Sequence, residues 1–195
     1  MKKNYLILIA VLSLFCFSFA IAESQSSLPA FTYTGDDPVL AAVSAETANY
    51  GSSFLLEDNS VSIPVPIVLK TETVDDTHMK VYGNFWVFNY TLKDDVLDQI
   101  SGGERPAIMS LEKKDEGWII TNVEECDSGA DYYLDIKRFC NGDKELEEAF
   151  ATSADASSPL FKEVFLKYLQ DYITANNLPA KFWKEYGTEL MPIFQ

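Results

Sequence analysis

The chain has 195 residues, 47% of them apolar, which is enough for one domain with a core of its own. It carries 15 basic and 30 acidic side chains, and the resulting net charge of −15 repels the phosphates of nucleic acids and anionic lipids. The composition therefore excludes nucleic acid as a partner.

Residues 1–22 have the plan of a secretory signal peptide. Lys2 and Lys3 precede an apolar run, and Ala20 and Ala22 are the small residues that a signal peptidase reads before it cuts. The run is shorter than the roughly 20 apolar residues of a spanning helix, so we expect no stable membrane insertion after cleavage. We expect the protein to be secreted or to be located in the periplasm or cell envelope.

Two alternatives exist for this segment. An uncleaved membrane anchor would need a longer apolar run, and serines interrupt this one. A lipoprotein would need acylation of Cys16, but the bulky Phe15 precedes it where a small residue is expected. Cleavage removes Lys2 and Lys3 and no acid, which lowers the basic count from 15 to 13 against 30 acids and gives a net charge of about −17.

Two cysteines, Cys126 and Cys140, remain after cleavage, an even number in an oxidising compartment. We predict that they form one disulfide, which closes a loop of about 15 residues and contributes roughly 3 kcal/mol in the chain-entropy model. Two buried free thiols are the alternative. The chain has no CxxC pair and only one histidine, His78, so we expect no metal, no cofactor and no catalytic residue of the Ser-His or Cys-His kind.

The next segment, 23–35, is rich in serine and predicts a flexible leader. Asp37 and Pro38 then supply an N-cap and a first-turn proline, and apolar residues recur at helical spacing as far as Gly51. From Val61 the apolar period changes to two, which indicates strands. We expect a four-stranded antiparallel meander with strands at 61–70, 79–93, 107–113 and 117–125, in which residues 75–78 and 98–104 are connections.

The last third of the chain reads as helical. Short helices are expected at 131–139 and 144–151, and the polar stretch 151–158 is the predicted hinge before the helical extension. Ser158 and Pro159 begin a long amphipathic helix with one broad apolar stripe. A short amphipathic turn at 180–189 then carries Phe182, Trp183 and Tyr186.

The predicted fold class is α+β. An N-terminal helix packs on the four-stranded antiparallel meander sheet, and helices follow at the C-terminus. In this division the sheet domain covers residues 36–150, and the C-terminal helical extension, 151–195, packs on the same core.

One strand is unusual, because the stretch VYGNFWVFNYTL, 81–92, has large side chains on both faces. A central strand between two helical layers explains the pattern as ordinary core. The alternative is that one face lines a cavity, where aromatic rings stack on a ligand and an asparagine makes a polar contact. The candidate ligand-binding residues are Tyr82, Asn84, Trp86, Phe88 and Tyr90.

The order of these elements over residues 37–126 resembles a known group of folds. A helix followed by long antiparallel strands, including VYGNFWVFNYTL and GWIITNVEEC, is similar to the cystatin-like and ketosteroid-isomerase-like group that contains the nuclear transport factor domains. The resemblance implies a curved sheet that wraps a helix into a cone, with an interior that often holds a ligand. It assigns no catalytic residue in this chain.

These observations favour a non-catalytic binding domain that takes a small molecule or a protein partner on the face or edge of its sheet. A small isomerase or dehydratase of the cone-fold type, with a buried carboxylate and a tyrosine, is the first alternative. The second alternative is an interaction module that docks a partner on Phe182, Trp183 and Tyr186.

Overall fold

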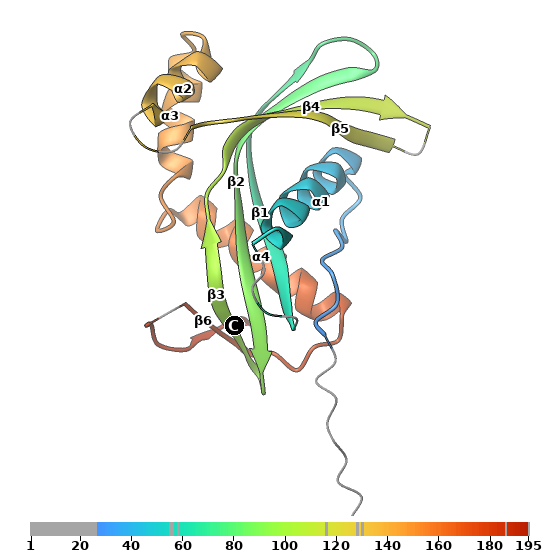
Figure 1. Cartoon of the computed structure of the whole chain (residues 1–195), viewed down its shortest axis with the longest axis vertical. Helices are drawn as coiled ribbons and strands as arrows, with labels where there is room; N and C mark the ends of the chain where they lie inside the picture. Colours follow the sequence, from blue (N-terminus) through green and yellow to red (C-terminus); the bar gives the residue numbers. More distant parts are fainter. Residues whose placement is uncertain are drawn as a thin grey trace, which may run out of the picture.

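The protein is an α+β fold in which one mixed sheet of seven strands carries helices on both faces (Figure 1). The computed structural model describes residues 27–54, 57, 59–115, 117–127, 129, 131–185 and 187–194. The predicted signal peptide and Tyr186 lie outside these residues. The elements in chain order are α1 (Pro38–Ser52), β1 (Ser60–Thr73), β2 (His78–Lys93), β3 (Val96–Gly103), β4 (Pro106–Lys114), β5 (Gly117–Glu125), α2 (Tyr132–Cys140), α3 (Lys144–Ser153), α4 (Pro159–Ala175), β6 (Phe182–Lys184) and β7 (Met191–Pro192).

Strand β2 is the hub of the sheet. One edge of β2 pairs with β1 over nearly its whole length. The other edge pairs with β4 through residues 78–84 and with β3 through residues 87–93. Between these two ladders the Phe85 amide donates to the Arg105 carbonyl at 3.0 Å. The sheet therefore divides at Glu104 and Arg105 into an arm of β4 and β5 and an arm of β3, β6 and β7, and we call this place the branch point.

The predicted four-stranded antiparallel meander is wrong in two respects. Residues 98–104 were expected to be a connection, but most of them belong to β3, which forms a tight hairpin with β2 across Asp94 and Asp95. The segment 180–189 was expected to be an amphipathic turn, but it contains β6, which pairs in parallel with β3. That parallel pairing, which places Val96 opposite Phe182, makes the sheet mixed.

Helix α1 covers one face of the sheet and begins where its capping residues predict. The Asp37 carboxylate accepts from the amides of Val39 and Leu40 at 2.8 and 3.1 Å, which satisfies two of the free amides of the first turn. The helix comes very close to β2 at Gly51, since a Cβ there would lie 2.3 Å from Cγ2 of Val87. The core under α1 consists of Val43, Val81, Phe85, Ala107, Met109 and Leu111.

Helix α4 covers the other face, and the Ser158 hydroxyl caps it by accepting from the Phe161 amide at 3.2 Å. Helices α2 and α3 lie beyond the start of α4 in Figure 1, and their core includes Tyr82 of β2 and Ile108 of β4. Both faces of β2 are thus buried under helices, which accounts for its large side chains on both sides. The core under α4 contains Val61, Ile63, Val65, Ile67, Phe88, Tyr90, Leu97, Phe161, Phe165, Tyr168, Leu169, Tyr172, Ile173, Ala180 and Ile193.

The described part of the predicted leader, residues 27–35, contacts α4. The Tyr172 hydroxyl donates to the Pro29 carbonyl at 2.7 Å, and the Phe31 ring stacks on the Tyr168 ring with 6.0 Å between centroids. Phe31 and Tyr33 both pack on the core under α4. Within the described residues, none of the helices combines the length and the apolar character needed to cross a bilayer.

Candidate functional site

The predicted ligand-binding residues of β2 lie on the face that α2, α3 and α4 cover. Trp86 contacts the Phe161 ring edge to face at 5.0 Å, and its Nε1 donates to the Ser153 carbonyl at 3.1 Å. Tyr82, Phe88 and Tyr90 are buried in the same layer. The structure therefore brings four of the five side chains together as packing residues against helices. A ligand role for them stays a prediction.

Asn84 is the exception on this face. It is fully buried, its Nδ2 donates to Oε2 of Glu104 at 3.1 Å, and its Oδ1 has no hydrogen-bond partner among the described residues. A buried acceptor without a partner is uncommon and costly. The sequence hint that an asparagine on this strand needs explanation thus applies to Asn84.

The predicted docking residues Phe182 and Trp183 lie on β6 and are half-buried. The Trp183 ring meets the Phe165 ring edge to face with 4.7 Å between centroids. Tyr186 lies outside the described residues. A docking role for this group stays a prediction.

The two cysteines lie in one cluster under α2, but both are free thiols in the structure, so the expected disulfide is not formed in it. Burial raises the pKa of the Cys126 thiol to about 12 and that of the Cys140 thiol to about 11, and nearby carboxylates add to both shifts. Both groups are therefore protonated and poor nucleophiles at neutral pH.

Arg105 is the charged centre of the branch point and is only 6% exposed. Its Nη1 lies 3.3 Å from Glu46 of α1, and its Nη2 lies 2.6 Å from Glu125 of β5. Its guanidinium also stacks on the Tyr50 ring, with 3.8 Å from Cζ to the centroid. The sequence analysis assigned Arg105 to no element and gave it no role. The available signal was that it is one of only two arginines in an acidic chain.

On the α1 side of the branch point is a half-enclosed hollow, which we call the aromatic cavity, with a volume of about 290 Å³. The rings of Tyr50 and Phe54 meet edge to face at 5.1 Å and form one wall. Gly103 forms part of another, and a Cβ placed on it would meet nothing within 4 Å. The lining residues are Tyr50, Phe54, Val87, Asn89, Ser101, Gly102, Gly103 and Glu104.

Asn89 fixes the polar part of this cavity. Its Nδ2 donates to the Ser101 hydroxyl at 2.8 Å and to the Gly51 carbonyl at 3.3 Å, and its Oδ1 accepts from the Ser62 hydroxyl at 2.6 Å. Because Ser101 accepts from Asn89, its own hydroxyl hydrogen is left to donate to another group. Asn89 thus acts as a positioning residue, while Ser101 and Glu104 supply the polar groups.

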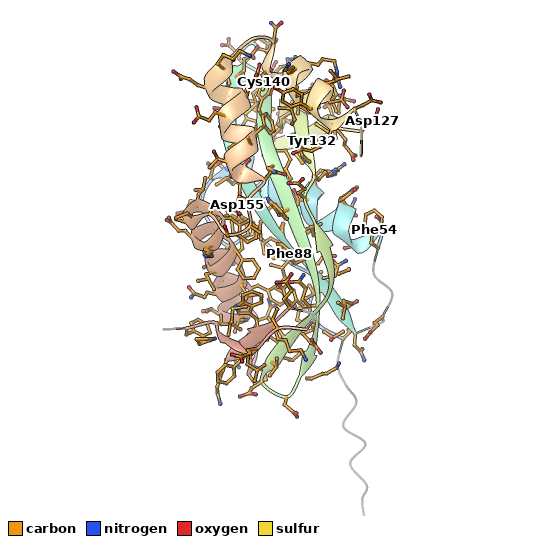
Figure 2. All side chains as sticks on the ribbon, turned by 90° about the vertical axis from the view of Figure 1, so that its left-hand side faces the viewer. Phe54, Phe88, Asp127, Tyr132, Cys140 and Asp155 are labelled. Atoms are coloured by element: carbon orange, nitrogen blue, oxygen red, sulfur yellow. The ribbon has the colours of Figure 1, made fainter. Side chains whose placement is uncertain are left out.

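A second hollow of about 500 Å³ lies beside α2 and shares Glu104 with the first. We call it the acidic cavity. Figure 2 shows two of its lining residues, Asp127 and Tyr132, near each other. Burial and the Glu104 charge raise the Tyr132 pKa to about 12, so its phenol is neutral. The lining residues are Glu104, Pro106, Cys126, Asp127, Gly129, Tyr132 and Ala154.

His78 is exposed at the first residue of β2, and the described contacts of its ring do not form a catalytic triad. The Thr77 hydroxyl and the Asp75 carboxylate both contact the same ring nitrogen, Nδ1, at 3.0 and 2.9 Å. A triad needs the carboxylate on one nitrogen and the nucleophile on the other. Among the described residues, no three or more His, Cys, Asp or Glu side chains are grouped so that they could hold a metal ion.

The fold and these hollows define an α+β domain with a branched mixed sheet and two adjoining cavities at the branch point. Comparisons of the chain with protein-family models, with curated proteins and with solved structures find no match. The resemblance to the cystatin-like and ketosteroid-isomerase-like group therefore stays a prediction, and the case for a function rests on the site.

Proposed function

We propose that this protein is a secreted or envelope-associated, non-catalytic binding domain that takes a small neutral molecule in the aromatic cavity. The observation that carries the proposal is a hollow of about 290 Å³ with an aromatic wall, bounded at its base by a fully hydrogen-bonded asparagine. Cavities of roughly 300 Å³, mostly apolar with a few fixed polar groups, are typical of sites for small ligands.

The lining specifies the chemistry of the ligand. Tyr50 and Phe54 offer flat apolar surfaces suited to a ring. Glu104 accepts hydrogen bonds, and the hydroxyl of Ser101 can donate one. A compact ring that carries hydroxyl groups meets both requirements. Arg105 does not compete for the ligand, because Glu46 and Glu125 already pair with it.

Binding of a peptide strand at an edge of the sheet is less well supported. The free edge of β1 contains Pro64 and Pro66, which cannot donate to a ladder. Another outer strand, β5, has an irregularity at Thr121, whose hydroxyl donates to the Ser110 carbonyl at 3.2 Å. Prolines and bulges are the usual devices that keep sheet edges from pairing.

The chemistry of the site also favours binding over isomerisation or dehydration. The carboxyl groups of such an isomerase work inside an apolar site, which raises the pKa of at least one of them. Glu104, the carboxylate of the aromatic cavity, is exposed to solvent. Asp94 and Asp95, at the end of the aromatic strand, form the turn between β2 and β3 and belong to the lining of neither cavity.

The experiment that tests the proposal is a titration with 4-hydroxybenzyl alcohol, followed by the backbone amide resonances of residues 101–104. We expect saturable shifts in the wild-type protein. Gly103→Leu should abolish them without unfolding the domain, because the added side chain enters open space in the cavity. Phe54→Ala should weaken binding, whereas Leu134→Ala, which shortens another exposed apolar side chain, should not. Absence of saturable shifts, or shifts that persist in Gly103→Leu, would overturn the proposal.

A further inference from the structure

We propose that Ser101 determines the specificity of the aromatic cavity, which takes a neutral ring compound whose ether or carbonyl oxygen accepts a hydrogen bond from the Ser101 hydroxyl. The inference rests on the proposed function, since it concerns the ligand of the same cavity, and it narrows the class of that ligand. It depends on the orientation of the Asn89 amide, which neighbouring groups fix.

The carbonyl of Gly51, near the end of α1, determines which way the Asn89 amide points. A carbonyl oxygen only accepts hydrogen bonds, and this one lies 3.3 Å from the amide. The atom that faces it must be Nδ2, because Oδ1 in that position would place two acceptors against each other. The helix brings this carbonyl close to β2 because Gly51 has no side chain, since a Cβ there would lie 2.3 Å from Cγ2 of Val87.

The orientation of this amide decides the role of Ser101. The same Nδ2 donates to the Ser101 hydroxyl at 2.8 Å, so Ser101 is the acceptor in that bond. Asn89 is only 2% exposed, and its Oδ1 accepts from the Ser62 hydroxyl at 2.6 Å, which agrees with the same orientation. Among the described residues, no acceptor takes the hydroxyl hydrogen of Ser101. This hydrogen is left for a ligand that enters the cavity.

The ligand atom next to Ser101 must therefore accept a hydrogen bond. A hydrocarbon group in its place would take the hydroxyl away from water and give it no partner, which weakens binding. An ether or carbonyl oxygen accepts the bond without carrying a charge, whereas a carboxylate would be repelled by Glu104, which lines the same hollow. Ser101 is thus the residue that contacts the ligand, and Asn89 is the residue that positions its hydroxyl.

The test compares two phenols of nearly equal size, 4-(methoxymethyl)phenol and 4-propylphenol, which differ by an ether oxygen in place of a methylene group. Each is titrated into the intact folded protein and followed through the backbone amide resonances of residues 101–104. Ser101→Ala should weaken binding of the ether about fivefold and leave binding of the propyl compound unchanged. Ser101→Thr keeps the hydroxyl and should retain the wild-type ratio of the two dissociation constants.

Ser157→Ala is the matched control, because it removes a hydroxyl from an exposed position between α3 and α4, and it should leave both affinities unchanged. Gly103→Leu should abolish binding of both phenols, which assigns them to the aromatic cavity. The inference is overturned if Ser101→Ala weakens binding of both phenols equally or of neither, or if Ser157→Ala has the same effect as Ser101→Ala. If neither phenol binds while 4-hydroxybenzyl alcohol does, the inference fails alone. If none of the three binds, the proposed function fails with it.

Discussion

Arg105 lies over the ring of Tyr50, with 3.8 Å between its Cζ and the ring centroid, at the point where the sheet divides. The same guanidinium joins Glu46 on α1 to Glu125 on β5. It thereby ties the helix to the outer strand of the β4 arm and positions the Tyr50 ring that lines the aromatic cavity.

Arg105→Met should lower the free energy of unfolding by about 2 kcal/mol, because it removes both ion pairs and the contact with Tyr50, while the partly exposed carboxylates regain water. Arg105→Lys should cost less, yet it cannot reproduce the planar stacking or bridge both acids. Urea unfolding measures both changes. Arg138→Lys, at an arginine that is half exposed, is the control and should stay within about 1 kcal/mol of wild type. Equal losses at the two arginines would contradict a special role for Arg105.

Two buried tyrosines should respond in opposite ways to loss of the hydroxyl. Tyr172 donates to the Pro29 carbonyl at 2.7 Å, so Tyr172→Phe should destabilise the fold by about 1 kcal/mol. The Tyr90 hydroxyl is fully buried without a partner among the described residues, so Tyr90→Phe should be neutral or stabilising. Thermal unfolding of the two variants beside wild type decides this. Destabilisation by Tyr90→Phe would reveal a partner for that hydroxyl.

Capping residues in the sequence predicted the start of the two long helices, α1 and α4. Asp37 and Ser158 both cap helices, as their side chains indicated. Strand β3 was missed because its last residues include two glycines, which resemble a connection. Strand β6 was missed because it has only three residues. Its parallel pairing with β3 depends on the position in space at which α4 ends, which its own sequence does not indicate.

The cavities were harder to foresee than the fold. The aromatic cavity combines Tyr50 of α1, Asn89 of β2 and Ser101 of β3, and no spacing in the sequence indicates that these three meet. The alternation along β2 did show that it is covered on both faces. It could not show that the face toward α4 would be filled by aromatic side chains while a hollow remained on the face toward α1.

The thiols should react slowly in the folded protein and only at high pH. Burial and nearby carboxylates raise the pKa of Cys126 to about 12 and that of Cys140 to about 11, from the usual value near 9. Because the folded state favours the protonated thiol, this contribution to stability is complete below about pH 9 and is lost as the pH rises through 11 to 12. Alkylation at pH 8 should be slow in native protein, and protein unfolded without reductant should take up two groups. Uptake of none after unfolding would show that the disulfide forms.

Trp183 offers a direct comparison between packing and docking on β6. Its ring contacts Phe165 at 4.7 Å and packs on the core under α4. Trp183→Ala should therefore lower the free energy of unfolding by about 2 kcal/mol, less than the full cost of a completely buried tryptophan. Phe194→Ala removes an exposed aromatic side chain from the same end of the chain and should change stability by less than about 0.5 kcal/mol. Unfolding in urea measures both. If Trp183→Ala leaves the free energy of unfolding unchanged, the ring contributes nothing to the core, and that result would support the docking hypothesis.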